Sequence, residues 1–132
     1  MDGCTSLSTV HESIGSLSKL RFLSLRDCTN LVVLPNSGST MSSLETLDLS
    51  GCSKLTTLPL QRTSYFSHPA SSCFGTEQSS YQPHYLSSLI FIDVSFCKLL
   101  QVPDAIGELQ HLERLNLQGN RFDSLPSSIN KL

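Results

Sequence analysis

The stretch from Leu44 to Pro59, LETLDLSGCSKLTTLP, places an aspartate, a cysteine and a lysine close together in the chain. One interpretation is a reactive thiol, Cys52, assisted by Asp48 and Lys54. The other is one unit of a repeat, in which leucines at fixed positions form a core and the cysteine marks a turn. These two interpretations are separated by looking for the same pattern elsewhere in the chain, before any site is assigned.

The pattern recurs three times, as LRFLSLRDCTNLVVLP (Leu20 to Pro35), LIFIDVSFCKLLQVP (Leu89 to Pro103) and LERLNLQGNRFDSLP (Leu112 to Pro126). The unit is LxxLxLxx[CN], with Ile or Val in place of some leucines, followed by an apolar step and LP or VP. Leu20 and Leu44 are 24 positions apart, and Leu89 and Leu112 are 23 apart. These periods fall inside the range of about 20 to 29 residues that is typical of leucine-rich repeats.

The repeat predicts an α/β solenoid. The segment xLxLx is a short strand whose leucines point inward while the residues between them point outward. One coil cannot bury its leucines alone, but stacked coils share a core and pair their strands in parallel. We therefore expect a leucine-rich-repeat horseshoe segment of about four to five repeats, with a parallel sheet on its concave face and no capping coil at either end.

One slot of the repeat is occupied by a small side chain at the turn after the strand. Such a side chain can bond the backbone of the neighbouring coil, strongly for Asn and weakly for Cys. Parallel side chains on stacked coils do not suit a disulfide, so free thiols are expected. Asp48, between two inward leucines, should point away from Cys52. The predicted ladder consists of Cys4, Cys28, Cys52, Cys97 and Asn120.

Outward strand positions form the candidate binding face, in three columns across the coils. The columns are Phe22, Thr46, Phe91 and Arg114; Ser24, Asp48, Asp93 and Asn116; and Arg26, Ser50, Ser95 and Gln118. Phe96 flanks the same surface. Exposed aromatic side chains favour a protein contact, because aromatics dominate interaction hot spots. Asp48 beside Asp93 is either an acidic spot for a basic partner or a pair of screened carboxylates.

A non-repeating segment interrupts the coils, since Leu44 and Leu89 are 45 positions apart and about 21 residues are therefore extra. We place leucine-rich repeats at residues 1–59 and 84–132, the first and last repeat being partial, and a Ser/Pro-rich insert loop at 60–83. The insert is expected to be a loop, with partner binding through its aromatic residues as the alternative. His68, Cys73 and His84 fit no common zinc spacing and lack a fourth ligand, so no metal is expected.

The composition of the chain argues against several classes of binding partner and cellular location. The 132 residues are 39% hydrophobic and carry a net charge of -2, which makes nucleic acid and anionic membranes poor partners. There is no apolar run of membrane-spanning length and no signal-peptide pattern at the N-terminus, so a cytoplasmic or nucleo-cytoplasmic location is expected. The chain also begins and ends part-way through a coil, which predicts an internal fragment.

With the repeat LxxLxLxxCxxLxxLP, the segment LSGCSKL and the steps VPDAIGEL and LPSSINKL, the chain resembles the leucine-rich-repeat region of plant intracellular nucleotide-binding disease resistance proteins, especially those with a TIR domain. The resemblance implies a non-enzymatic surface for effector sensing and autoinhibition. Its implied protein partners are a pathogen effector, a guarded host protein or the receptor's own nucleotide-binding core.

No phosphate-binding GxxxxGK[ST] motif is present, so no nucleotide or other cofactor is expected. Two alternatives remain beside the receptor: a generic intracellular repeat scaffold and a thiol-dependent enzyme.

Overall fold

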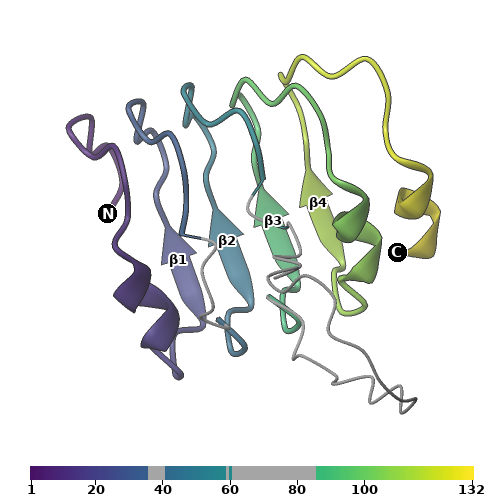
Figure 1. Cartoon of the computed structure of the whole chain (residues 1–132), viewed down its shortest axis with the longest axis horizontal. Helices are drawn as coiled ribbons and strands as arrows, with labels where there is room; N and C mark the ends of the chain where they lie inside the picture. Colours follow the sequence, from purple (N-terminus) through teal and green to yellow (C-terminus); the bar gives the residue numbers. More distant parts are fainter. Residues whose placement is uncertain (36–40, 59, 61–85) are drawn as a thin grey trace, which may run out of the picture.

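Four short parallel strands, stacked in chain order, organise the molecule. The computed structural model describes residues 1–35, 41–58, 60 and 86–132. Its strands are β1 (Phe22–Ser24), β2 (Thr46–Asp48), β3 (Phe91–Asp93) and β4 (Arg114–Asn116). They form one sheet in the order β1-β2-β3-β4, with the first coil at one end and the last at the other (Figure 1). This arrangement fits the predicted solenoid.

The strands pair in the register that the repeat predicts. Leu23 pairs with Leu47, Leu47 with Ile92, and Ile92 with Leu115, so the inward position of each coil lies on that of the next. Each strand is only three residues long and has the form x-L-x, or x-I-x in β3, with one inward residue between two outward ones.

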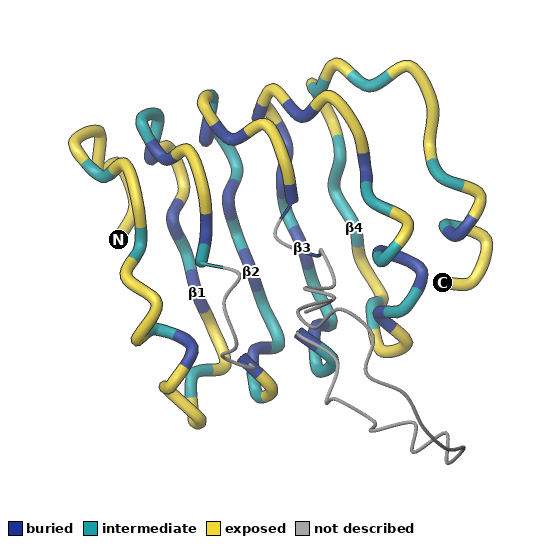
Figure 2. The backbone as a smooth tube through the Cα atoms, viewed as in Figure 1, coloured by how far each residue is buried: buried dark blue, intermediate teal, exposed yellow. Residues whose placement is uncertain are grey.

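The core is a stack of aliphatic side chains between the sheet and the returning half of each coil. Figure 2 shows the buried positions recurring from coil to coil. Leu25, Leu49 and Val94 are completely buried just after their strands, and Leu31, Leu55 and Leu99 are completely buried on the return. Leu60, the first residue of the expected insert, also belongs to this core. The rest of that insert, including His68 and Cys73, lies outside the described residues, and so does His84.

The turn after each strand, and the corresponding turn of the first coil, uses a left-handed backbone residue directly before the ladder position. The φ angles are 67° at Gly3, 54° at Asp27, 77° at Gly51, 54° at Phe96 and 70° at Gly119. Glycine adopts this conformation without strain, whereas Asp and Phe do so at a cost of about 1–2 kcal/mol each. The turn therefore recurs with the same geometry whether or not the side chain favours it.

The returning segments correct the α part of the α/β prediction. The described residues contain no α-helix; three 3-10 helices take its place, η1 (Glu12–Ser16), η2 (Asp104–Glu108) and η3 (Ser127–Lys131). The physical reason is length, because only five residues separate the extended N-cap from the next leucine. Short segments of this kind are where 3-10 geometry is common.

The η2 and η3 helices pack very closely on the side opposite the sheet. A Cβ atom on Gly107 would lie 2.3 Å from the backbone oxygen of Ser128. None of the helices in the described part of the chain is long and apolar enough to cross a membrane.

Candidate protein-interaction surface

The outward residues of the four strands form a continuous surface, here called the strand face, made of the three columns defined above. Phe22 pairs with Thr46, Thr46 with Phe91, and Phe91 with Arg114, and the Ser24 column is aligned in the same way. The third column continues the ladder beyond the strands, since the amide of Asp27 donates to the carbonyl of Ser50 at 2.8 Å.

The two strand aromatics lie in different environments. Phe22 is 61% exposed. Phe91 is half-buried, and the guanidinium carbon of Arg114 lies 5.3 Å from the centre of its ring, a cation–π geometry. Thr46 separates the two rings in the register. The strand face therefore holds one open aromatic ring and one that is already in contact with a cation.

The carboxylates of the second column act as caps at the strand ends. Asp48 Oδ1 accepts hydrogen bonds from the amide and hydroxyl of Ser50, at 3.0 and 2.7 Å. Asp93 Oδ1 accepts from the amide of Ser95 at 2.8 Å. The side-chain oxygen of Asn116 repeats the contact with the amide of Gln118. These residues therefore fix the turn that follows each strand, which is the usual role of short polar side chains at turns.

Neighbouring cations and donors relieve the repulsion between the paired aspartates. Arg26 Nε lies 3.6 Å from Asp48 Oδ2, and the Asn116 amide donates to Asp93 Oδ2 at 2.9 Å. Burial disfavours the charged form of Asp93, but hydrogen bonds from Ser95 and Asn116, with the nearby Arg26, outweigh it and hold the pKa of Asp93 below its usual range. Both carboxylates therefore have partners within the chain.

Two residues just after β3 depart from the simple alternation of inward and outward side chains. Ser95, expected to point outward, is buried. Phe96 is 59% exposed although its backbone is left-handed, and its ring lies so close to Gly119 that a Cβ there would meet Phe96 Cδ1 at 2.5 Å. Phe96 therefore presents an exposed ring above a turn that only glycine can occupy without a shift.

Inside the coils, thiols bond the backbone of the preceding coil. Cys52 Sγ donates to the carbonyl of Leu25 at 3.1 Å, and Cys97 Sγ donates to that of Leu49 at 3.2 Å. Cys28 makes a similar contact at 3.2 Å. All three are completely buried. Each thiol thus ties one coil to the next.

Asn120 takes the same slot in the last strand's coil and makes more contacts. Its Nδ2 donates to the carbonyls of Val94 and Leu117, at 2.8 and 2.9 Å, and its Oδ1 accepts from the amide of Leu99 at 3.0 Å. Three hydrogen bonds replace the contacts of a single S–H donor, because an amide has both donor and acceptor atoms.

The environment of the cysteines disfavours thiolate chemistry. Burial, with a smaller contribution from Cys97, raises the pKa of Cys52 to about 12, and burial raises the pKa of Cys97 to about 11. Burial also raises the pKa of Cys28. The thiolate is the nucleophile, so these thiols are poorly suited to attack. Cys4, in contrast, is exposed, and these four cysteines are free thiols.

The residues of the opening stretch do not form a catalytic group. The Asp48 carboxylate points to Ser50 and Arg26, the Cys52 thiol is buried against the preceding coil, and Lys54 is exposed. No group of three or more His, Cys, Asp or Glu that could hold a metal occurs among residues 1–35, 41–58, 60 and 86–132.

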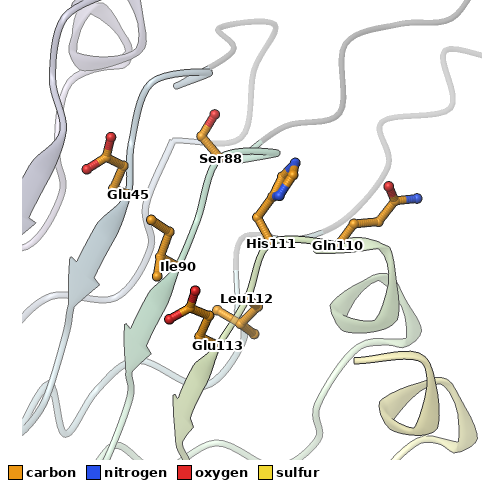
Figure 3. A pocket seen from close by; sticks show the side chains of 7 residues that line it. All are labelled: Glu45, Ser88, Ile90, Gln110, His111, Leu112 and Glu113. Carbon is orange, nitrogen blue, oxygen red and sulfur yellow. The ribbon is translucent and has the colours of Figure 1, made fainter.

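A second set of charged residues, which the repeat pattern alone did not single out, lies where the strands begin. Arg21 Nε and Nη2 both donate to Glu45 Oε1, at 2.8 and 2.6 Å. Figure 3 shows Glu45 near Ser88, Ile90 and the Gln110–Glu113 segment, around an open hollow. The signal was present in the sequence, because the residue before each strand is charged in three of the four repeats: Arg21, Glu45 and Glu113, with Ile90 as the exception.

Comparisons with known proteins agree with this geometry. The family model described as Leucine Rich Repeat matches residues 43–61 and 111–132. TMV resistance protein N of Nicotiana glutinosa is 43% identical over 49 residues, which is 36% of this chain and 4% of that protein's length. The chain therefore carries leucine-rich repeats and resembles part of the repeat region of a plant resistance protein.

Proposed function

We propose that this chain is a non-enzymatic protein-recognition module of a plant disease resistance receptor of the TIR nucleotide-binding class, and that the strand face receives the recognised protein. The observation that carries the proposal is the open ring of Phe22 on a face whose polar groups are held in place. Aromatic side chains of this kind are the usual anchors of protein interfaces.

The rigidity of the strand face supports this role. Asp48 and Asp93 cap the ends of their strands, and Arg114 covers the ring of Phe91. A surface that is already ordered loses little side-chain entropy when it binds, so more of the contact energy appears as affinity. Phe22 and Phe96 supply exposed apolar area at two separate places on it.

The partner is a pathogen effector, a guarded host protein or, in the resting receptor, the receptor's own nucleotide-binding core. In this proposal the coils number four to five and curve so that the strand face is concave, and the receptor works in the cytoplasm or the nucleus. The similarity to TMV resistance protein N supports the assignment to a resistance protein.

Phe22→Ala in the full-length receptor tests the proposal, with Val32→Ala as the matched control. Val32 is an exposed apolar residue, 48% accessible, that lies outside the strand face. Loss of an aromatic hot-spot residue costs about 2 kcal/mol of binding or more, which is roughly thirtyfold in affinity. Phe22→Ala should therefore abolish or strongly weaken recognition while Val32→Ala leaves it intact. Equal recognition by both variants would count against the strand face.

A further inference from the structure

Two open hollows along the edge of the sheet where the strands begin join into one groove. Their volumes are about 480 and 510 Å³, and both are lined by Glu45 and Ser88. One hollow extends from there to Lys19 and Arg21, and the other to His111 and Glu113. The strand-start groove, made of both hollows, therefore runs across the coils from β1 to β4, along an edge that the strand face does not include. Figure 3 shows the hollow that reaches His111 and Glu113.

The groove has opposite charges at its two ends. Lys19 and Arg21 are exposed at the β1 end, and Glu113 is exposed at the β4 end. Arg21 uses two of its five N–H donors on Glu45 and keeps the others for a further acceptor. In the described part of the chain, the side chains of Lys19 and Glu113 form no salt bridge. Each end can therefore pair with a charge of the opposite sign.

The floor of the groove is fixed by hydrogen bonds between coils. The carbonyl of Arg21 accepts from the amides of Glu45 and Thr46, at 2.9 and 3.0 Å, and the carbonyl of Ile90 accepts from the amide of Glu113 at 2.9 Å. Ser43 Oγ adds a bond to the carbonyl of Ser18 at 2.6 Å. The charged side chains are thus held at a set spacing.

That spacing has a length that a peptide can match. Arg21 and Glu113 are separated by three steps between neighbouring strands, about 14 Å at 4.8 Å per step. Four residues of extended chain cover about 13 Å, and residues i and i+4 of such a chain point to the same side. An acidic and a basic side chain four positions apart would reach both ends of the groove at once.

We propose that the strand-start groove binds an extended segment of a partner protein that carries an acidic residue and a basic residue four positions apart. The acidic side chain pairs with Arg21 and Lys19, and the basic side chain pairs with Glu113. The site is distinct from the strand face, so it provides a second contact for a partner. The serine hydroxyls and charged side chains that line the groove suit a polar segment rather than an apolar helix.

Titration of the isotope-labelled 132-residue chain with two synthetic peptides, followed by NMR, tests this site. The first peptide, acetyl-Gly-Glu-Ser-Ser-Ser-Arg-Gly-amide, has its charges at i and i+4. The second, acetyl-Gly-Glu-Arg-Ser-Ser-Ser-Gly-amide, has the same composition with adjacent charges. We expect the first to bind about 1.4- to fivefold more tightly, since it makes one more exposed ion pair and each such pair contributes about 0.2–1 kcal/mol. The shifts should map to Ser43, Ser88 and His111.

Two charge-reversal variants locate the effect. Glu113→Lys should remove the preference for the first peptide, whereas Glu12→Lys, an equal charge change on the exposed surface of η1, should leave it. Unchanged amide signals from the sheet would show that both variants are folded. Equal binding of the two peptides, binding of neither, or a preference that survives in Glu113→Lys would overturn the proposal. Groove signals that shift with protein concentration alone would also overturn it, by identifying a second copy as the occupant.

Discussion

The interior of the coils and the strand face use the same repeat in opposite ways. Inside, each slot holds nearly the same residue in every coil, as at Leu23, Leu47, Ile92 and Leu115. Outside, the neighbouring slot holds Phe22, Thr46, Phe91 and Arg114, which range from a small polar residue to two aromatic rings and a cation. A close-packed interior accepts side chains of only a narrow range of volumes, whereas a solvent-exposed position accepts side chains of many sizes. The strand face is therefore where neighbouring coils are free to differ and where specificity can arise.

Adjacent positions of β2 give the strongest contrast between inside and outside. Leu47 is 2% exposed, and Leu47→Ala should lower the free energy of unfolding by about 2–5 kcal/mol because it opens a cavity. Thr46→Ala, one residue away on the strand face, should cost about 1 kcal/mol or less. Urea unfolding followed by circular dichroism measures both. Similar losses of unfolding free energy in the two variants would contradict the assignment of Leu47 to the core and Thr46 to the strand face.

The turns provide a second contrast, between a crowded glycine and an open one. A Cβ at Gly51 would lie 2.2 Å from Asp27 Oδ1, whereas nothing lies within 4 Å of the same position at Gly3. Both residues have positive φ, so each alanine costs about 1–2 kcal/mol from the backbone. Gly51→Ala should cost about 0.5–1 kcal/mol more, because the exposed Asp27 side chain must rotate away from the added methyl group. Thermal unfolding of the two variants tests this, and equal melting temperatures would contradict it.

Much of this architecture is readable from the sequence because the constraints are periodic. Aligning Cys52 with Cys28 and Cys97 places each thiol in one slot, and the structure puts each beside a carbonyl of the preceding coil. Contacts between side chains of different coils were not predicted. Arg114 over Phe91 and the burial of Ser95 depend on rotamers and on neighbours from other repeats. The 3-10 returns were missed because the pattern fixes their length and apolar positions without fixing their hydrogen bonding.

Because their pKa values are raised, the buried thiols of the coil interior should lower the free energy of unfolding at high pH. No such effect is expected from the residues of the strand face. The pKa of Cys52 is raised from 9.0 to about 12 in the folded chain, so the folded state favours the neutral thiol. This contribution to stability is complete below pH 9 and is lost as the pH rises toward 12. Cys52→Ala should reduce this alkaline decline, which unfolding curves between pH 8 and pH 11 would measure. Parallel curves for the variant and the natural chain would contradict the assignment.

The smallest expected effect is a difference between Phe91 and Phe22 in their coupling energy with Arg114. A double-mutant cycle between Phe91→Leu and Arg114→Gln should give a coupling energy of about 0.5–1 kcal/mol, the size of an exposed cation–π contact. The same cycle between Phe22→Leu and Arg114→Gln should give none, because the two residues lie three strands apart. Comparable coupling energies in both cycles would show that Phe91 interacts with Arg114 no more strongly than Phe22 does.

Site-specific photo-crosslinking in the full-length receptor tests the central claim most directly. A photoreactive phenylalanine analogue would replace Phe22 in one protein and Val32 in another, both of which are exposed apolar positions. If the strand face receives the recognised protein, irradiation during recognition should link that protein, or the receptor's own core, to position 22 and not to position 32. Crosslinks from position 32 alone, or equal crosslinks from both positions, would contradict the account.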